Sequence, residues 1–221
     1  MLLNARLMHM SMLVKQGEFM KTLITEFISL DGVVQAPGGA SEDTDGGFGH
    51  GGWSMKYFDP VVMGGIYAEL AAQSDALLQG RRTYQVSAAA WPGRSGDPFT
   101  DWINRVQKYV VSDTLTDQDA TWNPTAIIRG ADFLPKVSEL RARPGGYIYV
   151  YGSATMVRSL LAADLVDELL LTIEPSSSVG GRRSSLMMER RSPSCWCRRS
   201  KPARALRCAD TLELGSPFCA G

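Results

Sequence analysis

The segment ALLQGRRTYQVSAAAW (residues 76–91) has the pattern of a buried strand that turns directly into a helix. Its apolar run ends at Gly80, two arginines follow, and the helical pattern begins near Thr83. Backbone N–H groups at a helix start attract anions, and glycine lets a phosphate approach the backbone closely. Arg81 and Arg82 add planar cations suited to phosphate. The segment predicts either a phosphate-binding turn or a plain strand–helix turn with solvated arginines.

A second segment, YVYGSATMVRSLL (residues 149–161), repeats this design. Gly152 and Ser153 join a buried strand to a helix, so the same reasoning predicts a second anion-facing turn. The alternative is an ordinary capped helix, with Ser153 or Thr155 as the cap. Two such turns, about 70 residues apart in the chain, suit the two ends of a dinucleotide better than one small anion.

Strand and helix patterns alternate along the chain between residues 20 and 175. Short apolar strands that alternate with longer helices predict an α/β fold, a three-layer αβα sandwich with a mostly parallel sheet. In such sheets, ligands bind outside the carboxyl ends of the strands. The strand candidates are residues 22–29, 76–80, 108–112, 126–130, 147–153 and 165–175, and the helix candidates are residues 58–73, 81–91, 97–107, 132–143 and 154–163.

The composition is that of a globular protein, with 44% hydrophobic and 21% charged residues among 221. No apolar run approaches the ~20 residues of a membrane-spanning helix, so no membrane partner is expected. All four cysteines fall at or after Cys195, which favours a reducing, cytoplasmic location for the rest of the chain. His9 and His50 are the only histidines. A multi-histidine metal site is therefore excluded, and neither of the standard glycine-rich nucleotide fingerprints is present.

A third element follows the first strand, in EFISLDGVVQAPGG (residues 26–39) and the glycine-rich, acidic stretch after it. Asp31 could orient or protonate a substrate; the alternative is a simple Asp-Gly turn. A glycine-rich segment this long is usually functional or a lid. Within it, Trp53 and Tyr57 could stack on a heterocyclic substrate, or they could pack the lid.

The order SLDG, LLQGRRTY, YVVS, YGSATMVRSLL and LVDELLLTIEP resembles the dihydrofolate reductase-like superfamily. It is most similar to the group that contains the C-terminal reductase domain of riboflavin biosynthesis. The resemblance covers residues 20–175, and its motifs are specific in combination. It implies a dihydrofolate reductase-like sheet and NADPH-dependent reduction of a small heterocyclic or ribosylamino-pyrimidine-like substrate, of riboflavin-pathway or pterin type. Because related reductases often dimerise, it also implies a possible homodimer.

The resemblance also implies roles for individual positions. Leu30, Gly32 and Val33 would flank the nicotinamide, beside the catalytic candidate Asp31, and Ser112 would lie beside the adenine-ribose. The turns quoted above would hold the phosphates of NADPH: the adenosine-side phosphates at Gly80, Arg81, Arg82 and Thr83, and the pyrophosphate at Gly152, Ser153, Ala154 and Thr155.

Both ends of the chain depart from this pattern. Residues 1–19 are interpreted as an over-extended start or a disordered leader. From Ser176 onward there are nine Lys+Arg and three Asp+Glu, and SSSVGG and SLMME replace the glycine-rich and acidic motifs of similar proteins. Codons exist that restore both motifs with the same one-base offset. We therefore interpret residues 176–221 as a frameshifted, poorly ordered tail, with the last strands of the sheet lost and activity impaired.

Two other functions are compatible with these residues. One is a non-catalytic nucleotide-binding protein or an inactive remnant, because a truncated sheet would not close the site. The other is nucleic-acid binding through the basic tail, which would be strongly salt-dependent. Similar proteins with a deaminase half carry zinc ligands that this sequence lacks, so either the reductase part alone or a stand-alone relative of unknown substrate is expected here.

Overall fold

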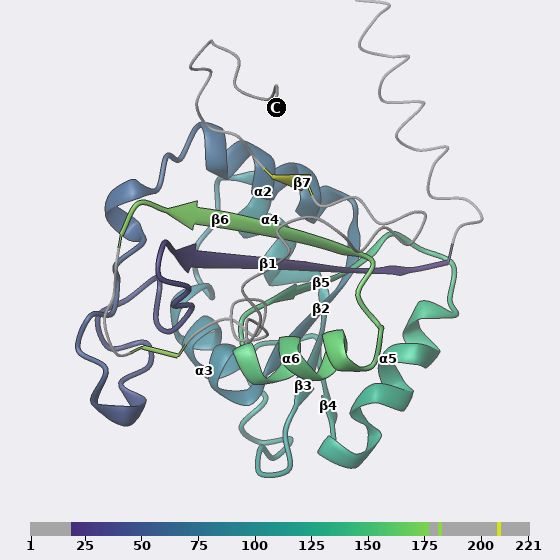
Figure 1. Ribbon diagram of the computed structural model, residues 1–221. Helices are drawn as coiled ribbons and strands as arrows, with labels where there is room; N and C mark the ends of the chain where they lie inside the picture. Colours follow the sequence, from purple (N-terminus) through teal and green to yellow (C-terminus); the bar gives the residue numbers. More distant parts are fainter. Residues whose placement is uncertain (1–18, 177–180, 183–206, 209–221) are drawn as a thin grey trace, which may run out of the picture.

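The computed structural model describes residues 19–176, 181–182 and 207–208 (Figure 1). Its described strands form one sheet in the order β4-β3-β2-β5-β1-β6-β7, and every neighbouring pair is parallel. The predicted mostly parallel α/β sheet is therefore confirmed. The strands are β1 (Lys21–Ser29), β2 (Ser74–Gly80), β3 (Gln107–Val111), β4 (Thr125–Ile128), β5 (Tyr147–Tyr151), β6 (Glu168–Glu174) and β7 (Arg207–Cys208).

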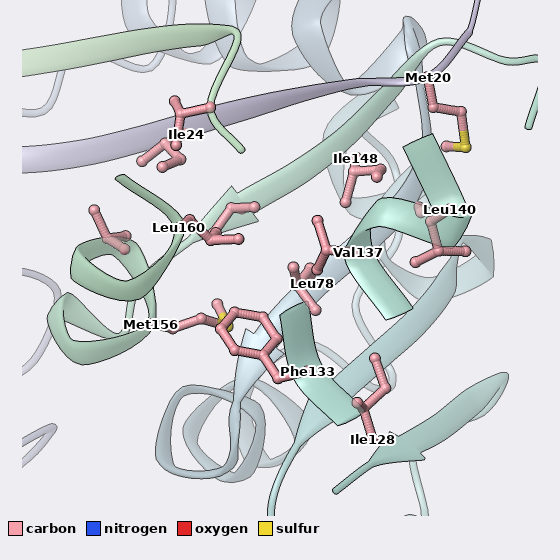
Figure 2. Packing of buried hydrophobic residues seen from close by; sticks show 14 residues of the cluster. Met20, Ile24, Leu78, Ile128, Phe133, Val137, Leu140, Ile148, Met156 and Leu160 are labelled. Atoms are coloured by element: carbon pink, nitrogen blue, oxygen red, sulfur yellow. The ribbon is translucent and has the colours of Figure 1, made fainter. Parts of the chain in front are cut away.

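Helices cover both faces of this sheet, which confirms the three layers. On one face, α2 (Val62–Ala72), α3 (Arg81–Ala90) and α4 (Pro98–Arg105) pack with Leu77 and Tyr149 of the central strands. On the other face, α5 (Phe133–Arg141) and α6 (Ala154–Ala162) pack around a separate cluster of buried hydrophobic residues (Figure 2). The described residues also include the short 3-10 helices η1 (Asp45–Gly47), η2 (Met55–Tyr57) and η3 (Gly130–Asp132).

Local sequence signals set the helix starts on the first face. The Asp97 side chain accepts a hydrogen bond from the Thr100 backbone N–H (2.9 Å) and Pro98 is the first residue of α4, the preferred arrangement at a helix start. Asp59 behaves similarly, because its Oδ1 accepts from the N–H groups of Val61 and Val62 (2.8 and 3.0 Å). The helix itself begins at Val62, four residues after the start of the candidate at residue 58, and residues 60 and 61 form a turn.

The glycine-rich stretch after β1 folds into a small core of its own. Val33, Ala36, Phe48 and Trp53 are buried together, and the Trp53 indole N–H donates to the Gln35 carbonyl oxygen at 2.8 Å. This segment, residues 30–57, is called the cap below. It lies beyond the carboxyl end of β1, where the ligand of a parallel sheet is expected.

The two unusual ends lie mostly outside the described residues. Residues 1–18 are among these, so the predicted leader is not tested. After Ser176, the described parts of the tail are Gly181, Arg182 and β7, whose two residues pair in parallel with Leu170 and Leu171 of β6. The frameshift and the loss of the last strands stay predictions. Within the described ranges, no helix is both long and apolar enough to cross a membrane.

One buried charge stands out in the fold. Lys108 of β3 is 0% exposed. Its Nζ donates to the carbonyl oxygens of Asn104 (3.2 Å) and Val106 (3.0 Å) and lies 4.4 Å from the centroid of the Trp122 ring. Burial lowers the pKa of Lys108 from its ordinary value of 10.5 to about 8.

We expect the free energy of unfolding to rise as the pH is raised from about 8 to about 10. In this window the folded protein releases the Lys108 proton while the unfolded chain retains it, so stability increases with pH, by about 2–3 kcal/mol. Urea unfolding across this range measures the slope. The Lys108→Met variant should lose it, and an unchanged slope in that variant would contradict the assignment.

Candidate functional site

The two predicted anion-facing turns meet at the carboxyl edge of the sheet. β2 and β5 are neighbouring parallel strands, with Leu78 paired to Val150, so the turns after them lie side by side. A Cβ on Gly80 would come within 2.9 Å of the Cβ of Ser153, and one on Gly152 within 3.0 Å of Thr83 Cγ2. Each glycine therefore makes room for a side chain of the other turn.

The connections of the sheet reverse direction at this point. β2 continues through α3 and α4 to β3 on one side, whereas β5 continues through α6 to β6 on the other. Because the two routes leave in opposite directions, α3 and α6 lie on opposite faces and their first turns converge at the edge. Such a switch point is the usual ligand crevice of an open α/β sheet.

The electrostatic environment at the carboxyl ends of β2 and β5 favours an anion. Neither α3 nor α6 has a side-chain hydrogen bond from its N-cap residue, Gly80 or Ser153. The first N–H groups of both helices lack this cap and carry the positive end of the helix dipole. Gly152 and Ser153 both have positive φ (71° and 69°), which is unfavourable for serine and common at functional turns. The residues present therefore fit a phosphate group.

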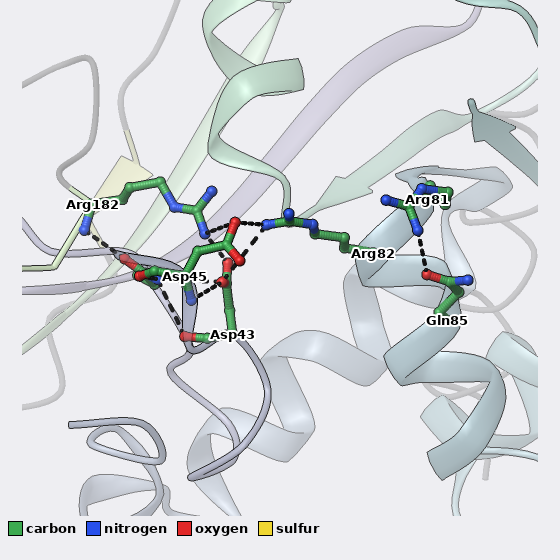
Figure 3. Close-up of polar contacts among 7 residues, drawn as sticks. Asp43, Asp45, Arg81, Arg82, Gln85 and Arg182 are labelled. Atoms are coloured by element: carbon green, nitrogen blue, oxygen red, sulfur yellow. Dashed lines mark hydrogen bonds and ion pairs between the residues drawn. The ribbon is translucent and has the colours of Figure 1, made fainter. Parts of the chain in front are cut away.

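Arg82 is occupied by carboxylates of the cap (Figure 3). Its guanidinium pairs with Asp45 and lies 3.9 Å from Asp43, which also pairs with Arg182. The hydrogen bond from Arg82 lowers the pKa of Asp45. Arg81 points along its own helix and donates to Gln85 Oε1 at 3.0 Å. The cap thus supplies an internal anion to one of the two arginines predicted to hold phosphate.

The residues predicted at the ends of β3 and β1 are engaged in their own turns. Ser112 Oγ accepts from the N–H groups of Thr114 and Leu115 (3.1 and 2.8 Å). Ser29 Oγ donates to Asp31 Oδ1 at 2.6 Å and accepts from the Val33 N–H at 2.9 Å. These contacts, with Gly32 at φ 84°, are those of the Asp-Gly turn alternative. The catalytic role of Asp31 and the ribose contact of Ser112 stay predictions.

The positions predicted beside the nicotinamide and the substrate differ in exposure. Leu30 is 65% exposed, whereas Val33 is fully buried in the core of the cap. Trp53 is buried in the same core, which is the lid-packing alternative. Tyr57 donates its hydroxyl hydrogen to the Pro175 carbonyl oxygen at 3.0 Å, so it links the cap to the end of β6. Substrate contacts of Trp53 and Tyr57 remain untested.

Sequence reasoning assigned no role to a buried polar group at the end of β6. Glu174 is 4% exposed, and burial raises its pKa. On the same face, Thr172 Oγ1 lies 2.6 Å from the hydroxyl of Tyr67, whose pKa is raised to about 12, chiefly by burial. The available signal was the alternation in LLLTIE, which turns Leu170, Thr172 and Glu174 to one face of the strand.

A second polar group lies beneath the two turns. Tyr151 and Gln79 immediately precede Gly152 and Gly80, and both contact Ser87 of α3: its Oγ is 2.7 Å from the Tyr151 hydroxyl and accepts from Gln79 Nε2 at 3.2 Å. Burial raises the pKa of Tyr151. These side chains tie α3 to the strands on both sides of the switch point and so fix the spacing of the turns.

Comparison with known proteins gives a family match over most of the chain. The sequence model of the RibD C-terminal domain family matches residues 21–216, a range that continues beyond residue 175. The protein YyaP of Bacillus subtilis is 30% identical over 114 residues, which cover 49% of this chain and 58% of YyaP. The match thus spans less than two thirds of that relative.

One solved structure supports the fold. A protein from Shewanella sp. PV-4, whose name assigns it to riboflavin biosynthesis, superposes with a TM-score of 0.55 at 20% identity, over 74% of this chain and 82% of its own. The riboflavin biosynthesis reductase Rib7 of Saccharomyces cerevisiae gives a TM-score of 0.42 at 16% identity, over 78% and 82% of the two chains. The first likeness supports the dihydrofolate reductase-like fold, and the second is too low to carry an argument.

We expect Gly152→Ala to destabilise the protein by about 1–3 kcal/mol, because the new Cβ would meet Thr83 in a backbone conformation unfavourable for alanine. Gly64→Ala is the matched control. Gly64 lies inside α2, and a Cβ there would have nothing within 4 Å, so alanine should stabilise by about 0.5–1 kcal/mol. Urea unfolding of both variants measures the difference. Equal stability of the two would contradict the packed-turn geometry.

Proposed function

Because the chain belongs to the RibD C-terminal domain family, we propose that it is an NADPH-dependent reductase of riboflavin-pathway type. The substrate class proposed is a small nitrogen heterocycle, such as a ribosylamino-pyrimidine or a pterin. The single observation that carries the proposal is the paired turn: two uncapped helix starts, from opposite faces of the sheet, packed against each other through Gly80 and Gly152.

The chain's own groups match the parts of such a cofactor. The turn at Gly152–Thr155 would hold the pyrophosphate, and Gly80, Arg81, Arg82 and Thr83 would hold the adenosine-side phosphates. When bound, NADPH would supply the electrons and the hydrogen for the reduction. The protein would orient the two reactants and exclude water.

The cap has the contacts needed for that exclusion. Its core of Val33, Ala36, Phe48 and Trp53 is closed, and it is attached to the end of β6 through Tyr57 and to α3 through the Arg82–Asp45 pair. These attachments lie on two sides of the switch point. A bound cofactor and substrate at this edge would therefore be covered by the cap, which keeps water from the reacting atoms.

Calorimetric titration of the chain with NADPH, and separately with NADH, tests the proposal. We expect NADPH to bind more tightly than NADH. Arg82→Ala should weaken NADPH about tenfold and NADH little, because a guanidinium–phosphate contact is worth on the order of 1.5–3 kcal/mol. Arg105→Ala is the control, since this exposed arginine ends α4 and precedes the opposite, amino edge of β3.

The outcomes separate the alternatives. Binding together with oxidation of NADPH in the presence of a pyrimidine or pterin supports the reductase. Binding without oxidation of NADPH by any such compound favours the non-catalytic nucleotide-binding protein. Absence of NADPH binding would overturn both.

The ion pair of the cap gives a further prediction. Asp45 competes with phosphate for Arg82, so Asp45→Asn should tighten NADPH binding several-fold, and the gain should shrink at high salt as the interaction is screened. Asp117→Asn removes an equal charge from an exposed turn and should leave the affinity unchanged. Weaker binding in Asp45→Asn would show that Asp45 helps the site instead of competing for it.

A further inference from the structure

The end of β6 holds an acceptor atom whose hydrogen bond is missing. Glu174 is 4% exposed, and within the described part of the chain its Oε1 is buried and has no hydrogen-bond partner. Buried polar atoms are almost always paired, and an unpaired one is unfavourable enough to need an explanation. A ligand that brings a hydrogen-bond donor would satisfy this atom.

The groups around Glu174 are suited to a flat ring. Tyr67 of α2 is close enough for the Glu174 charge to contribute to its raised pKa. The Tyr67 ring lies 5.7 Å, centroid to centroid, from the ring of Phe27, which is paired with Thr172 in the register of β1 and β6. Two aromatic side chains beside one polar acceptor are the usual combination in sites that bind planar heterocycles.

This group lies on the same sheet edge as the phosphate turns but at a distance from them. β6 is separated from β5 by β1, so Glu174 stands two strand spacings, about 10 Å, to the side of the Gly152 turn. In register it is level with Ser29, where the SLDG turn begins. The phosphates of a dinucleotide and a second, smaller ligand can therefore bind along one edge without overlapping.

The cover over Glu174 is thin. Pro175, the next residue along the chain, is exposed. The Pro175 carbonyl oxygen accepts the hydroxyl hydrogen of Tyr57, a residue of the cap. A second contact joins the cap to this segment, because the Leu30 N–H donates to the Ser176 carbonyl oxygen at 2.9 Å. Release of both contacts would open a short route to the carboxyl group.

We propose that Glu174 anchors the substrate: its Oε1 accepts an N–H hydrogen bond from the amino-bearing edge of a planar nitrogen heterocycle that lies against Phe27 and Tyr67. The choice of a nitrogen heterocycle rests on the proposed function, whereas the need for a donor rests on Glu174 itself. The site is separate from the two turns predicted to hold the phosphates of NADPH, and it lies level with the start of the turn predicted to flank the nicotinamide.

Calorimetry of the full chain with 2,4-diaminopyrimidine tests this assignment, with 2,4-dimethoxypyrimidine as a probe of similar shape that has no N–H donor. We expect the diamino compound to bind at least tenfold more weakly to Glu174→Gln, and not detectably to Glu174→Leu. The dimethoxy compound should bind weakly and equally to all three proteins. Tyr67→Phe, which keeps the ring, should lose only a fewfold of affinity.

Glu168→Gln is the matched control, because Glu168 lies on the same strand and its Oε1 already accepts from the Tyr147 hydroxyl at 2.8 Å. Its affinity for the diamino compound should equal that of the unmodified chain. Thermal melting identifies any variant that fails to fold; Glu174→Leu should melt no lower than the unmodified chain, because the unpaired acceptor is removed.

Two results would contradict the role of Glu174 in binding the heterocycle. One is that Glu174→Gln binds the diamino compound as tightly as the unmodified chain does, and the other is that the unmodified chain does not bind the compound. NADPH titration of the same preparations separates this failure from that of the proposed function. If NADPH binds normally while the diamino compound binds all variants equally, the role of Glu174 is wrong and the proposed function still stands.

Discussion

The contact between the turns that follow β2 and β5 is the constraint on which the rest of this structure depends. Gly80 faces Ser153 and Gly152 faces Thr83, at distances that leave no room for a Cβ. This contact requires β2 and β5 to be neighbours, which fixes the point where the connections of the sheet reverse. It also brings the starts of α3 and α6 together although the two helices cover opposite faces. The fold thus concentrates two helix dipoles at one place on its edge.

The charges around this place are balanced by the cap. A pair of helix starts and two arginines make the edge positive, and Asp43 and Asp45 are held against Arg82 by the folding of the glycine-rich segment. Such an exposed pair contributes little to stability, so its main effect is on what can bind. Under the proposed function, a phosphate would compete with Asp45 for Arg82, and this competition would couple ligand binding to the position of the cap.

The polar groups inside the protein differ in how fully the fold satisfies their hydrogen bonds. Lys108 is deeply buried, yet its Nζ donates to two carbonyl oxygens and lies over an aromatic ring. Gln79, Ser87 and Tyr151 are linked to one another beneath the turns. Glu174 keeps a carboxyl oxygen without a donor. Glu174 is distinguished by its position, because it ends β6 on the side of the sheet where ligands reach parallel strands.

The sequence alone determined the succession of strands and helices, because periodicity, Asp-Pro caps and Gly turns act within a few residues. It also predicted the two strand–helix turns after β2 and β5, since strand, glycine and helix start are consecutive in the chain. Only the tertiary structure decided their contact, the pairing of Arg82 with Asp45, and the placement of Trp53 inside the cap. It also decided the burial of Glu174 at the end of β6. Each of these joins residues far apart in the sequence, and local pattern carries no information about which strands become neighbours.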